Sequence, residues 1–238
     1  MVESVRLVGI SASPRKGANT DILVKTAIDA SKSYLEREGI NLEFELLSLA
    51  GKRLLPCTNC QACSQSGDFC VLKDDWRELV HPLIDPVPDG VVFGSPVYFF
   101  NQTALGRIYM ERCTSLIQKQ WNPELPNDPP DFSTTAAGAI AVGFDRNGGM
   151  ETTMTSVLHW FLIMKFVTVG GFYVGAAGWS GHEDAEKERT AVLGDTIGLN
   201  SARVLGRKVA STALLLKLGR SAWEGSLPVP WESSPESE

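Results

Sequence analysis

Short apolar runs alternate with amphipathic stretches along most of this 238-residue chain. The first run, residues 5–10, is followed by small, polar and turn-forming residues, which is typical of a buried strand that leads into a loop. Apolar positions then recur at helical spacing over residues 23–34, and a second strand-like run covers residues 41–49. The chain therefore opens with a predicted strand, loop, helix and second strand.

The same alternation continues toward the C-terminus. Further strands are expected within residues 89–96, 136–144 and 166–176, and further helices within residues 76–83, 103–117, 152–165 and 182–217. Thr103 is expected to cap its helix, and Cys113 to fill the core face of that helix. Five strands alternating with helices predict an α/β fold with an open, doubly wound, five-stranded parallel sheet.

Composition and charge exclude some classes of partner. The formal net charge is −6 and Lys and Arg form no basic stripe, so we expect no nucleic-acid partner. Residues 160–179 carry one charge, Lys165, but they divide into a helix end and a glycine-containing strand, so we expect no membrane span. The N-terminal residues lead directly into a strand without the pattern of a signal peptide, which predicts a cytoplasmic protein.

The loop after the first strand, "SASPRKGANT", contains the parts of a phosphate site. Hydroxyl and amide groups accompany one guanidinium directly before a helix N-terminus, and the residues concerned are Ser11, Ser13, Arg15, Asn19 and Thr20. The dinucleotide motif G-x-G-x-x-G and the P-loop motif G-x-x-x-x-G-K-[ST] are both absent. A monophosphate, such as that of flavin mononucleotide (FMN), therefore suits this loop better than a pyrophosphate, and an ordinary capped turn is the alternative.

Two further loops follow strands that are expected to end at the same edge of the sheet. In "SPVYFFNQT", Pro96 stiffens the chain and three aromatic residues follow at positions 98–100, where a planar ligand would gain from stacking. Packing under the next helix, or in a subunit interface, is the alternative for these rings. In "DRNGGMETT", Gly148 and Gly149 allow close approach of backbone amides, and Arg146 offers a positive charge or is a solvated surface residue.

Four of the five cysteines lie within fourteen positions, in the pattern C-x2-C-x2-C-x6-C formed by Cys57, Cys60, Cys63 and Cys70. In a reducing compartment such spacing favours metal or thiol chemistry over a disulfide framework. Compact C-x2-C-x2-C runs suit a [4Fe-4S] cluster, whereas zinc sites usually separate two C-x-x-C pairs by a longer span. Zinc and free or reversibly oxidised thiols stay open as alternatives. The three histidines lie far apart and no hydrolytic constellation is present, so no catalytic side chain is assigned.

Read together, the loops resemble the flavodoxin-like NAD(P)H-dependent FMN reductases and, within them, the iron-sulfur flavoproteins. The resemblance covers residues 5–218 and is carried by "GISASPRKGANT", "CTNCQACSQSGDFCVLKDD", "DGVVFGSPVYFFNQT" and "GGMETT". It implies a flavodoxin-like FMN-binding domain over residues 1–218 with a cysteine-rich insertion at 52–75. Residues 219–238, rich in Pro, Ser and Glu, are expected to form an extended or disordered tail.

The resemblance also implies roles for individual residues. The residues implied to contact the phosphate are Ser11, Ser13, Arg15, Asn19 and Thr20. Those implied to border the flavin ring and ribityl chain are Pro96, Val97, Tyr98, Phe99 and Asn101, and those implied to face the other edge of the ring are Gly143, Arg146, Gly148 and Gly149. The implied cluster ligands are Cys57, Cys60, Cys63 and Cys70. The implied assembly is a homodimer or homotetramer.

The implied activity is that of an FMN-dependent oxidoreductase. Electrons would come from NAD(P)H or a ferredoxin-like protein and pass to a small acceptor such as a quinone, a flavin or an oxygen species. The flavin would supply the redox chemistry and the protein would set its orientation and access. A non-enzymatic electron carrier, and an FMN reductase without a cluster, are the alternatives.

Overall fold

Strands and helices alternate along the computed structural model, which describes residues 2–66, 69–126, 128–145, 147–171, 173–181 and 189–223. The strands are β1 (Ser4–Ser11), β2 (Asn41–Ser48), β3 (Gly90–Pro96), β4 (Ala136–Gly143), β5 (Val167–Thr168) and β6 (Ala176–Trp179). The α-helices are α1 (Asn19–Arg37), α2 (Ala62–Ser66), α3 (Trp76–Ile84), α4 (Ala104–Arg112), α5 (Met150–Ile163) and α7 (Thr196–Ala222). Short 3-10 helices are η1 (Cys113–Leu116), η2 (Gln118–Gln120) and η3 (Ala191–Gly194).

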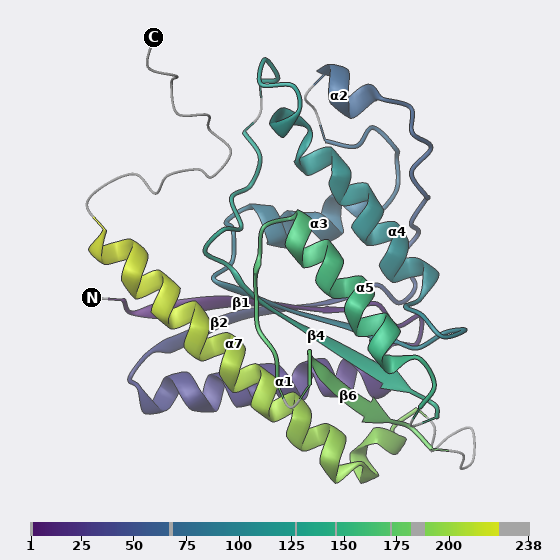
Figure 1. Ribbon diagram of the computed structural model, residues 1–238, viewed down its shortest axis with the longest axis vertical. Coiled ribbons are helices and arrows are strands. Elements are labelled where there is room, and N and C mark those ends of the chain that lie inside the picture. The colour runs from purple at the N-terminus through teal and green to yellow at the C-terminus, as the bar shows by residue number, and fades with distance from the viewer. Residues whose placement is uncertain are drawn as a thin grey trace.

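The strands form one parallel sheet in the order β2-β1-β3-β4-β5, and β6 also pairs with β4 (Figure 1). The chain runs outward from β1 to β2 and then returns past β1 to β3. This reversal of strand order is the mark of a doubly wound sheet, and the order matches that of flavodoxin-like folds. The predicted open, doubly wound α/β fold is confirmed.

The last strand position differs from the single strand predicted over residues 166–176. Two short strands occupy it, since β5 pairs with the start of β4 and β6 pairs with the end of β4. Gly175 lies where the chain rejoins the sheet, and a Cβ at this position would clash with the carbonyl oxygen of Ala139. Such close backbone approach is a recognised use of glycine within a strand pattern.

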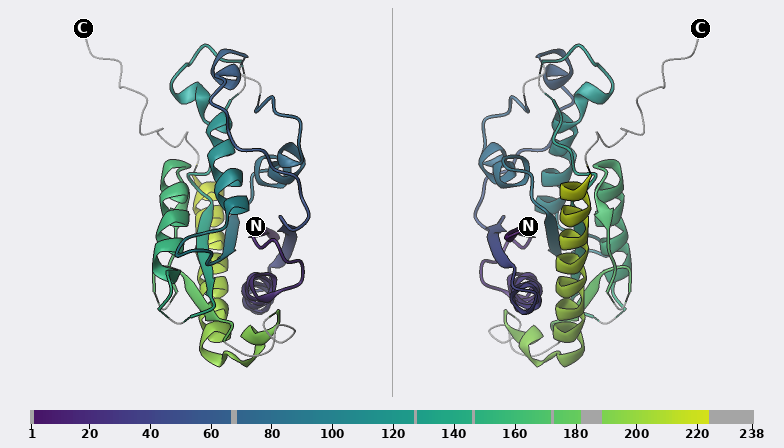
Figure 2. Two further views of the ribbon diagram at one scale, coloured as in Figure 1. Left: turned by 90° about the vertical axis from the view of Figure 1, so that its right-hand side faces the viewer. Right: turned by 90° about the vertical axis from the view of Figure 1, so that its left-hand side faces the viewer.

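Two hydrophobic cores lie on opposite faces of the sheet. Alternate residues of β3 serve both, since Val91 and Phe93 pack with α3, α4 and α5, whereas Val92 packs with α1 and α7. The side views show this division into helical layers (Figure 2). Because both faces are covered at the centre of the sheet, β3 and β4 are continuous apolar runs, whereas the edge strand β2 carries exposed polar residues at alternate positions.

Several helix ends also differ from the sequence-based expectation. The Thr103 hydroxyl caps α4 by accepting from the Gly106 N–H at 3.1 Å, as predicted, and Cys113 is fully buried in the core. The helix predicted over 103–117 tightens into η1 after residue 112. The helix predicted from residue 182 begins at Thr196, because Asp195 caps it through the Gly198 N–H.

The C-terminal helix α7 extends to Ala222, four residues beyond the predicted domain end at 218. Most of the predicted tail, residues 224–238, lies outside the described residues, as does the start of the predicted last helix at 182–188. No helix in the described part of the chain is long and apolar enough to cross a bilayer.

Candidate functional site

A crevice opens at the carboxyl end of the sheet, between the loops that follow β1 and β3. The two strands are neighbours, and the Ala12 N–H still donates to the Gly94 carbonyl at 2.8 Å. Beyond that bond the chains separate, since β1 leads into α1 on one face and β3 leads into α4 on the other. Such a switch point is where ligands bind in open α/β sheets.

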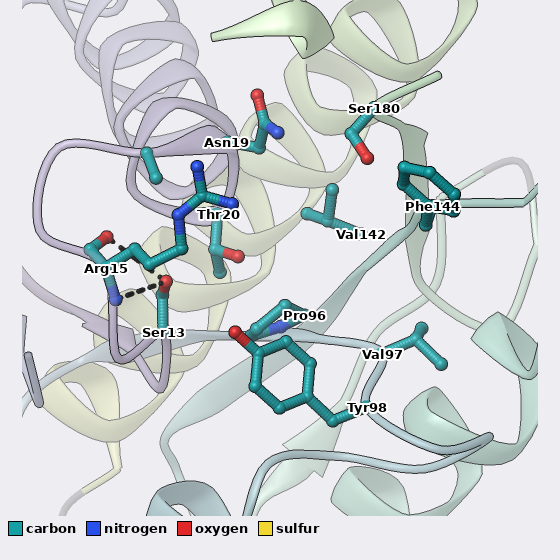
Figure 3. A pocket seen from close by; sticks show the side chains of 11 residues that line it. Ser13, Arg15, Asn19, Thr20, Pro96, Val97, Tyr98, Val142, Phe144 and Ser180 are labelled. Atoms are coloured by element: carbon teal, nitrogen blue, oxygen red, sulfur yellow. Dashed lines mark hydrogen bonds between the residues drawn. The ribbon is translucent and has the colours of Figure 1, made fainter. Parts of the chain in front are cut away.

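The crevice contains a hollow, which Figure 3 shows from close by. Seven of the residues predicted to contact FMN line it: Ser13, Arg15, Asn19, Thr20, Pro96, Val97 and Tyr98. Four further lining residues were not predicted: Ala18, Val142, Phe144 and Ser180.

Polar and apolar groups occupy different sides of this hollow. Figure 3 shows Ser13, Arg15 and Asn19 on the side of the β1–α1 loop, while Val142 and Phe144 lie across the hollow at the end of β4. The Tyr98 ring borders the hollow between these two sides. The arrangement suits a ligand with an anionic group at one end and a flat, apolar part at the other.

The N-terminus of α1 faces the polar side. Ala18, at the N-cap position, has no side-chain oxygen to cap the helix, and both Ala18 and Thr20 line the hollow. The first N–H groups of a helix have no partner within the helix and carry its positive dipole end. Together with the Arg15 guanidinium, this helix end provides positive charge where an anion would bind.

A carboxylate on the far side of the loop fixes its shape. Asp21 accepts hydrogen bonds from the Ser11 hydroxyl at 2.5 Å and from the Gly17 N–H at 2.7 Å. The Ser13 hydroxyl in turn accepts from the Arg15 N–H at 3.1 Å. Ser11, a predicted phosphate contact, is therefore engaged with Asp21 and does not line the hollow.

The aromatic loop after β3 is a tight turn. The Tyr98 N–H donates to the Asn101 carbonyl at 2.7 Å, and the Asn101 N–H donates to the Tyr98 carbonyl at 3.1 Å. The two residues between them, Phe99 and Phe100, have positive φ angles of 47° and 65°. The Phe99 side chain is fully exposed. Phe99 and Asn101 were both predicted to border the flavin, but neither lines the hollow.

The loop between β4 and α5 packs against the aromatic loop after β3. Gly149, with φ of 92°, packs against the backbone of Phe100. Gly143 accepts a hydrogen bond from the Ser180 N–H at 3.0 Å and thereby holds Ser180 at the rim. Gly143, Gly148 and Gly149 do not line the hollow themselves, and Arg146 lies outside the described residues.

Two of the lining residues that were not predicted do have a signal in the sequence. Val142 and Phe144 alternate at the end of an apolar run, where the carboxyl end of a parallel strand must face the ligand crevice. Ser180 gave no such signal, because the separate strand β6 that directly precedes it was not expected.

The four cysteines predicted as metal ligands line a second hollow, near the last turn of α4 and the short helix α2. Glu111, Arg112 and Gln118 are among the other residues around it. In Figure 1, α2 lies beyond the far end of α4. A helix rise of about 1.5 Å per residue places the two ends of α4 about 12 Å apart, so the two hollows lie at opposite ends of one helix.

The environment of Cys63 in the second hollow disfavours its thiolate form when no metal is bound. Burial raises the pKa of the Cys63 thiol above its usual value, and the sulfurs of Cys57, Cys60 and Cys70 raise that pKa further, against a backbone hydrogen bond that lowers it. Four negative charges gathered here would need a compensating positive centre. Thiolate ligands gain that compensation from a bound metal.

A buried ion pair borders the second hollow. Arg112 and Asp74 are joined by a contact of 2.7 Å, and their side chains are 1% and 0% exposed. Although burial would raise the pKa of the Asp74 carboxyl, hydrogen bonds from Arg112 and from the backbone at Leu55 and Trp76 lower it below its usual value. Arg112 also donates from Nε to the Cys70 Sγ at 3.0 Å.

Comparison with known proteins agrees with this geometry. Residues 5–180 match the family model described as NADPH-dependent FMN reductase. An iron-sulfur flavoprotein of Methanocaldococcus jannaschii is 36% identical over 90% of this chain and 100% of its own length, and one of Methanosarcina thermophila is 28% identical over 91% and 99%.

Comparison with solved structures gives the same fold. A flavodoxin-type, WrbA-like protein from Agrobacterium tumefaciens superposes with a TM-score of 0.54 at 14% identity, covering 89% of this chain and 98% of its own. At that identity the likeness concerns the fold alone. The family match and the close relatives carry the assignment, and the chain belongs to the NADPH-dependent FMN reductase family, in its iron-sulfur flavoprotein branch.

Proposed function

We propose that this protein is an FMN-dependent oxidoreductase that also carries a [4Fe-4S] cluster. The observation that carries the proposal is the hollow at the β1/β3 switch point, which places a guanidinium and an open helix N-terminus opposite apolar and aromatic side chains. An anionic phosphate and a flat ring system are the two parts of FMN. Family membership supports the same cofactor.

The residues of the first hollow fit FMN by their chemistry. Ser13, Arg15 and Thr20 would hold the phosphate together with the first turn of α1. Pro96, Val97 and Tyr98 would border the ring system on one side, and the end of β4 on the other. When bound, FMN supplies the ability to accept a hydride or single electrons, and the surrounding side chains orient it and limit its contact with water.

The residues of the second hollow fit a cluster better than zinc. A single zinc ion needs its ligand atoms about 2.0–2.3 Å from one point. In the described part of the chain no three His, Cys, Asp or Glu side chains are arranged to hold a metal ion, so the preference for a cluster rests on the C-x2-C-x2-C spacing of the cysteines. A [4Fe-4S] cluster takes one thiolate at each of four iron atoms, so its ligands surround a larger volume, as the four cysteines around this hollow do. The names of the relatives favour the same group.

NAD(P)H or a ferredoxin-like protein is the proposed electron donor, and a quinone, a flavin or an oxygen species the acceptor. Cys57 and Cys60 are exposed, so a protein donor could approach the cluster directly and deliver single electrons. The adjacent exposed rings of Phe99 and Phe100 near the first hollow support assembly into a homodimer or homotetramer, since exposed aromatic side chains that lie together gain from a partner surface. A cytoplasmic location completes the proposal.

The visible spectrum and metal content of anaerobically purified protein test both cofactors. We expect flavin absorbance, FMN released on denaturation, and iron with acid-labile sulfide at about four of each per chain. The Cys60→Ser variant should lose the iron and retain the FMN. A colourless protein that does not bind added FMN would contradict the flavin assignment, and equal iron in both samples would contradict the cysteine assignment.

Steady-state kinetics separate the enzyme from a non-enzymatic electron carrier. Oxidation of NADH or NADPH, or of reduced ferredoxin, is followed with a quinone or free flavin as acceptor. Multiple turnovers with any of these pairs are expected of the enzyme. One electron transfer per bound FMN, without turnover, would indicate a carrier.

A further inference from the structure

The Arg112 side chain lies at the boundary between the cysteine hollow and the apolar core. Its Nη1 donates to the Asp74 Oδ2 at 2.7 Å and to the Leu55 carbonyl at 2.9 Å. Its guanidinium carbon lies 5.0 Å from the centre of the Trp76 ring, a cation–π distance. The remaining donor, Nε, points at the Cys70 Sγ at 3.0 Å.

These contacts fix the direction of the guanidinium. A planar guanidinium offers donors in a rigid fork, so two groups that hold Nη1 and Nη2 also determine where Nε–H points. Asp74 holds both, since its Oδ1 accepts from Nη2 at 3.3 Å. The Asp74 carboxylate is itself held by the Leu55 N–H at 2.6 Å and the Trp76 N–H at 3.1 Å.

The bond to Cys70 has one chemically possible direction. A guanidinium stays protonated in proteins and has no acceptor, so it can only donate, and the Cys70 sulfur must accept. Sulfur accepts far better as a negatively charged thiolate than as a neutral thiol, because hydrogen bonds to ionised groups are the strong ones. The geometry is therefore built for a charged sulfur at position 70.

We propose that Arg112, held in place by Asp74, is a positioning residue that fixes Cys70 as the fourth cluster ligand and raises the reduction potential of the site through its hydrogen bond to the Cys70 sulfur. The inference rests on the proposed cluster. One-electron reduction adds one negative charge to the four-thiolate site, and a charged donor at one sulfur stabilises the reduced form more than the oxidised form. Hydrogen bonds to the sulfurs are a known determinant of such potentials.

A purely structural role for the ion pair makes a different prediction. Arg112, at the end of α4, also bonds to Leu55 and Asp74, which lie at the two ends of the cysteine segment. If that were their whole role, weakening the pair would lower stability and cluster retention, but the potential of the clusters that remain would not change.

The test compares midpoint potentials of anaerobically purified Arg112→Lys, Arg112→Gln and wild-type protein in redox titrations monitored by electron paramagnetic resonance. Lysine keeps the charge but is a single point donor on a flexible stem. We expect it to lose the directed bond to Cys70 and to lower the equilibrium constant for one-electron reduction about tenfold, a shift of about 59 mV to more negative potential. Arg112→Gln removes the positive charge as well as the directed donor, so its potential should shift further in the same negative direction.

Arg107→Lys is the matched control, because Arg107 lies on the exposed face of the same helix and does not border the cysteine hollow. Retained FMN reports a folded core in every variant, since the FMN hollow lies at the other end of α4. Should one variant fail to fold, the potential of the other decides. Wild-type potentials in the folded variants would overturn the inference while leaving the cluster in place, whereas wild-type protein without iron would overturn the proposed cluster and the inference together.

Discussion

A Cβ atom on Gly149 would lie 2.6 Å from the Cα of Phe100 and 2.8 Å from its carbonyl oxygen. The loop that precedes α5 therefore packs directly against the aromatic turn beside the first hollow. This contact joins two loops that belong to different strands, and it requires a glycine on one side.

Gly149→Ala should destabilise the protein and weaken FMN binding. The substitution combines a positive φ of 92° with a backbone clash, and backbone strain of this kind costs about 1–3 kcal/mol. Urea unfolding and FMN titration measure the two effects. Gly39→Ala is the control, because Gly39 has φ of 71° but no atom within 4 Å of an added Cβ. Equal losses in the two variants would show that the contact with Phe100 contributes nothing.

Arg15→Ala should lower the affinity for FMN by about one to two orders of magnitude. A hydrogen bond to a charged group contributes about 1.5–3 kcal/mol, and 1.4 kcal/mol corresponds to a factor of ten. Fluorescence quenching of FMN added to the apoprotein measures the dissociation constant. Lys16→Ala removes a neighbouring positive charge from a residue that does not line the hollow. If the Arg15 variant binds FMN as tightly as the Lys16 variant, the Arg15 guanidinium does not contact the phosphate.

The aromatic turn should become more stable when its residues match its backbone. Phe99 and Phe100 both have positive φ angles, a geometry that Asn-Gly adopts with the least strain. Replacing the pair by Asn-Gly should raise the free energy of unfolding by about 1 kcal/mol or more, since strain at each position costs of that order.

The same variant reports what the exposed rings do. If they cover a neighbouring subunit, size-exclusion chromatography with light scattering should show dissociation toward smaller species. A variant that is less stable as an isolated chain would mean that the rings make stabilising contacts within the monomer.

Acid should weaken the fold partly through Asp74. Its pKa is lower in the folded protein than the value of about 3.9 expected in the unfolded chain. Between these two values the unfolded state binds more protons, so the stability that the carboxylate contributes is fully present above about pH 4 and is lost as pH falls through the folded pKa.

Urea unfolding from pH 3 to pH 7 measures this loss. The difference in stability between the wild type and the Asp74→Asn variant should be largest at neutral pH and should shrink below about pH 4. A difference that stays constant across the range would mean that Asp74 titrates in the folded protein as it does in the unfolded chain.

The sequence by itself determined the layered α/β fold and the three loops at the edge of the sheet. These features follow from local signals, namely apolar runs, helical periodicity, caps such as Thr103, and clusters of small and polar residues between strands. The cysteine spacing likewise lies within one short segment. Such local signals can be recognised without knowing which segments meet in space.

Only the tertiary structure decided which side chains face which hollow. Ser11 and Ser13 are two residues apart, yet Ser11 donates to Asp21 behind the loop while Ser13 lines the hollow. No signal in the sequence marks Arg112, and only the fold brings it to Cys70, 42 positions earlier in the chain. Such contacts depend on how distant segments pack, because the position of a side chain at a loop or helix end is set by the neighbours that the whole fold supplies.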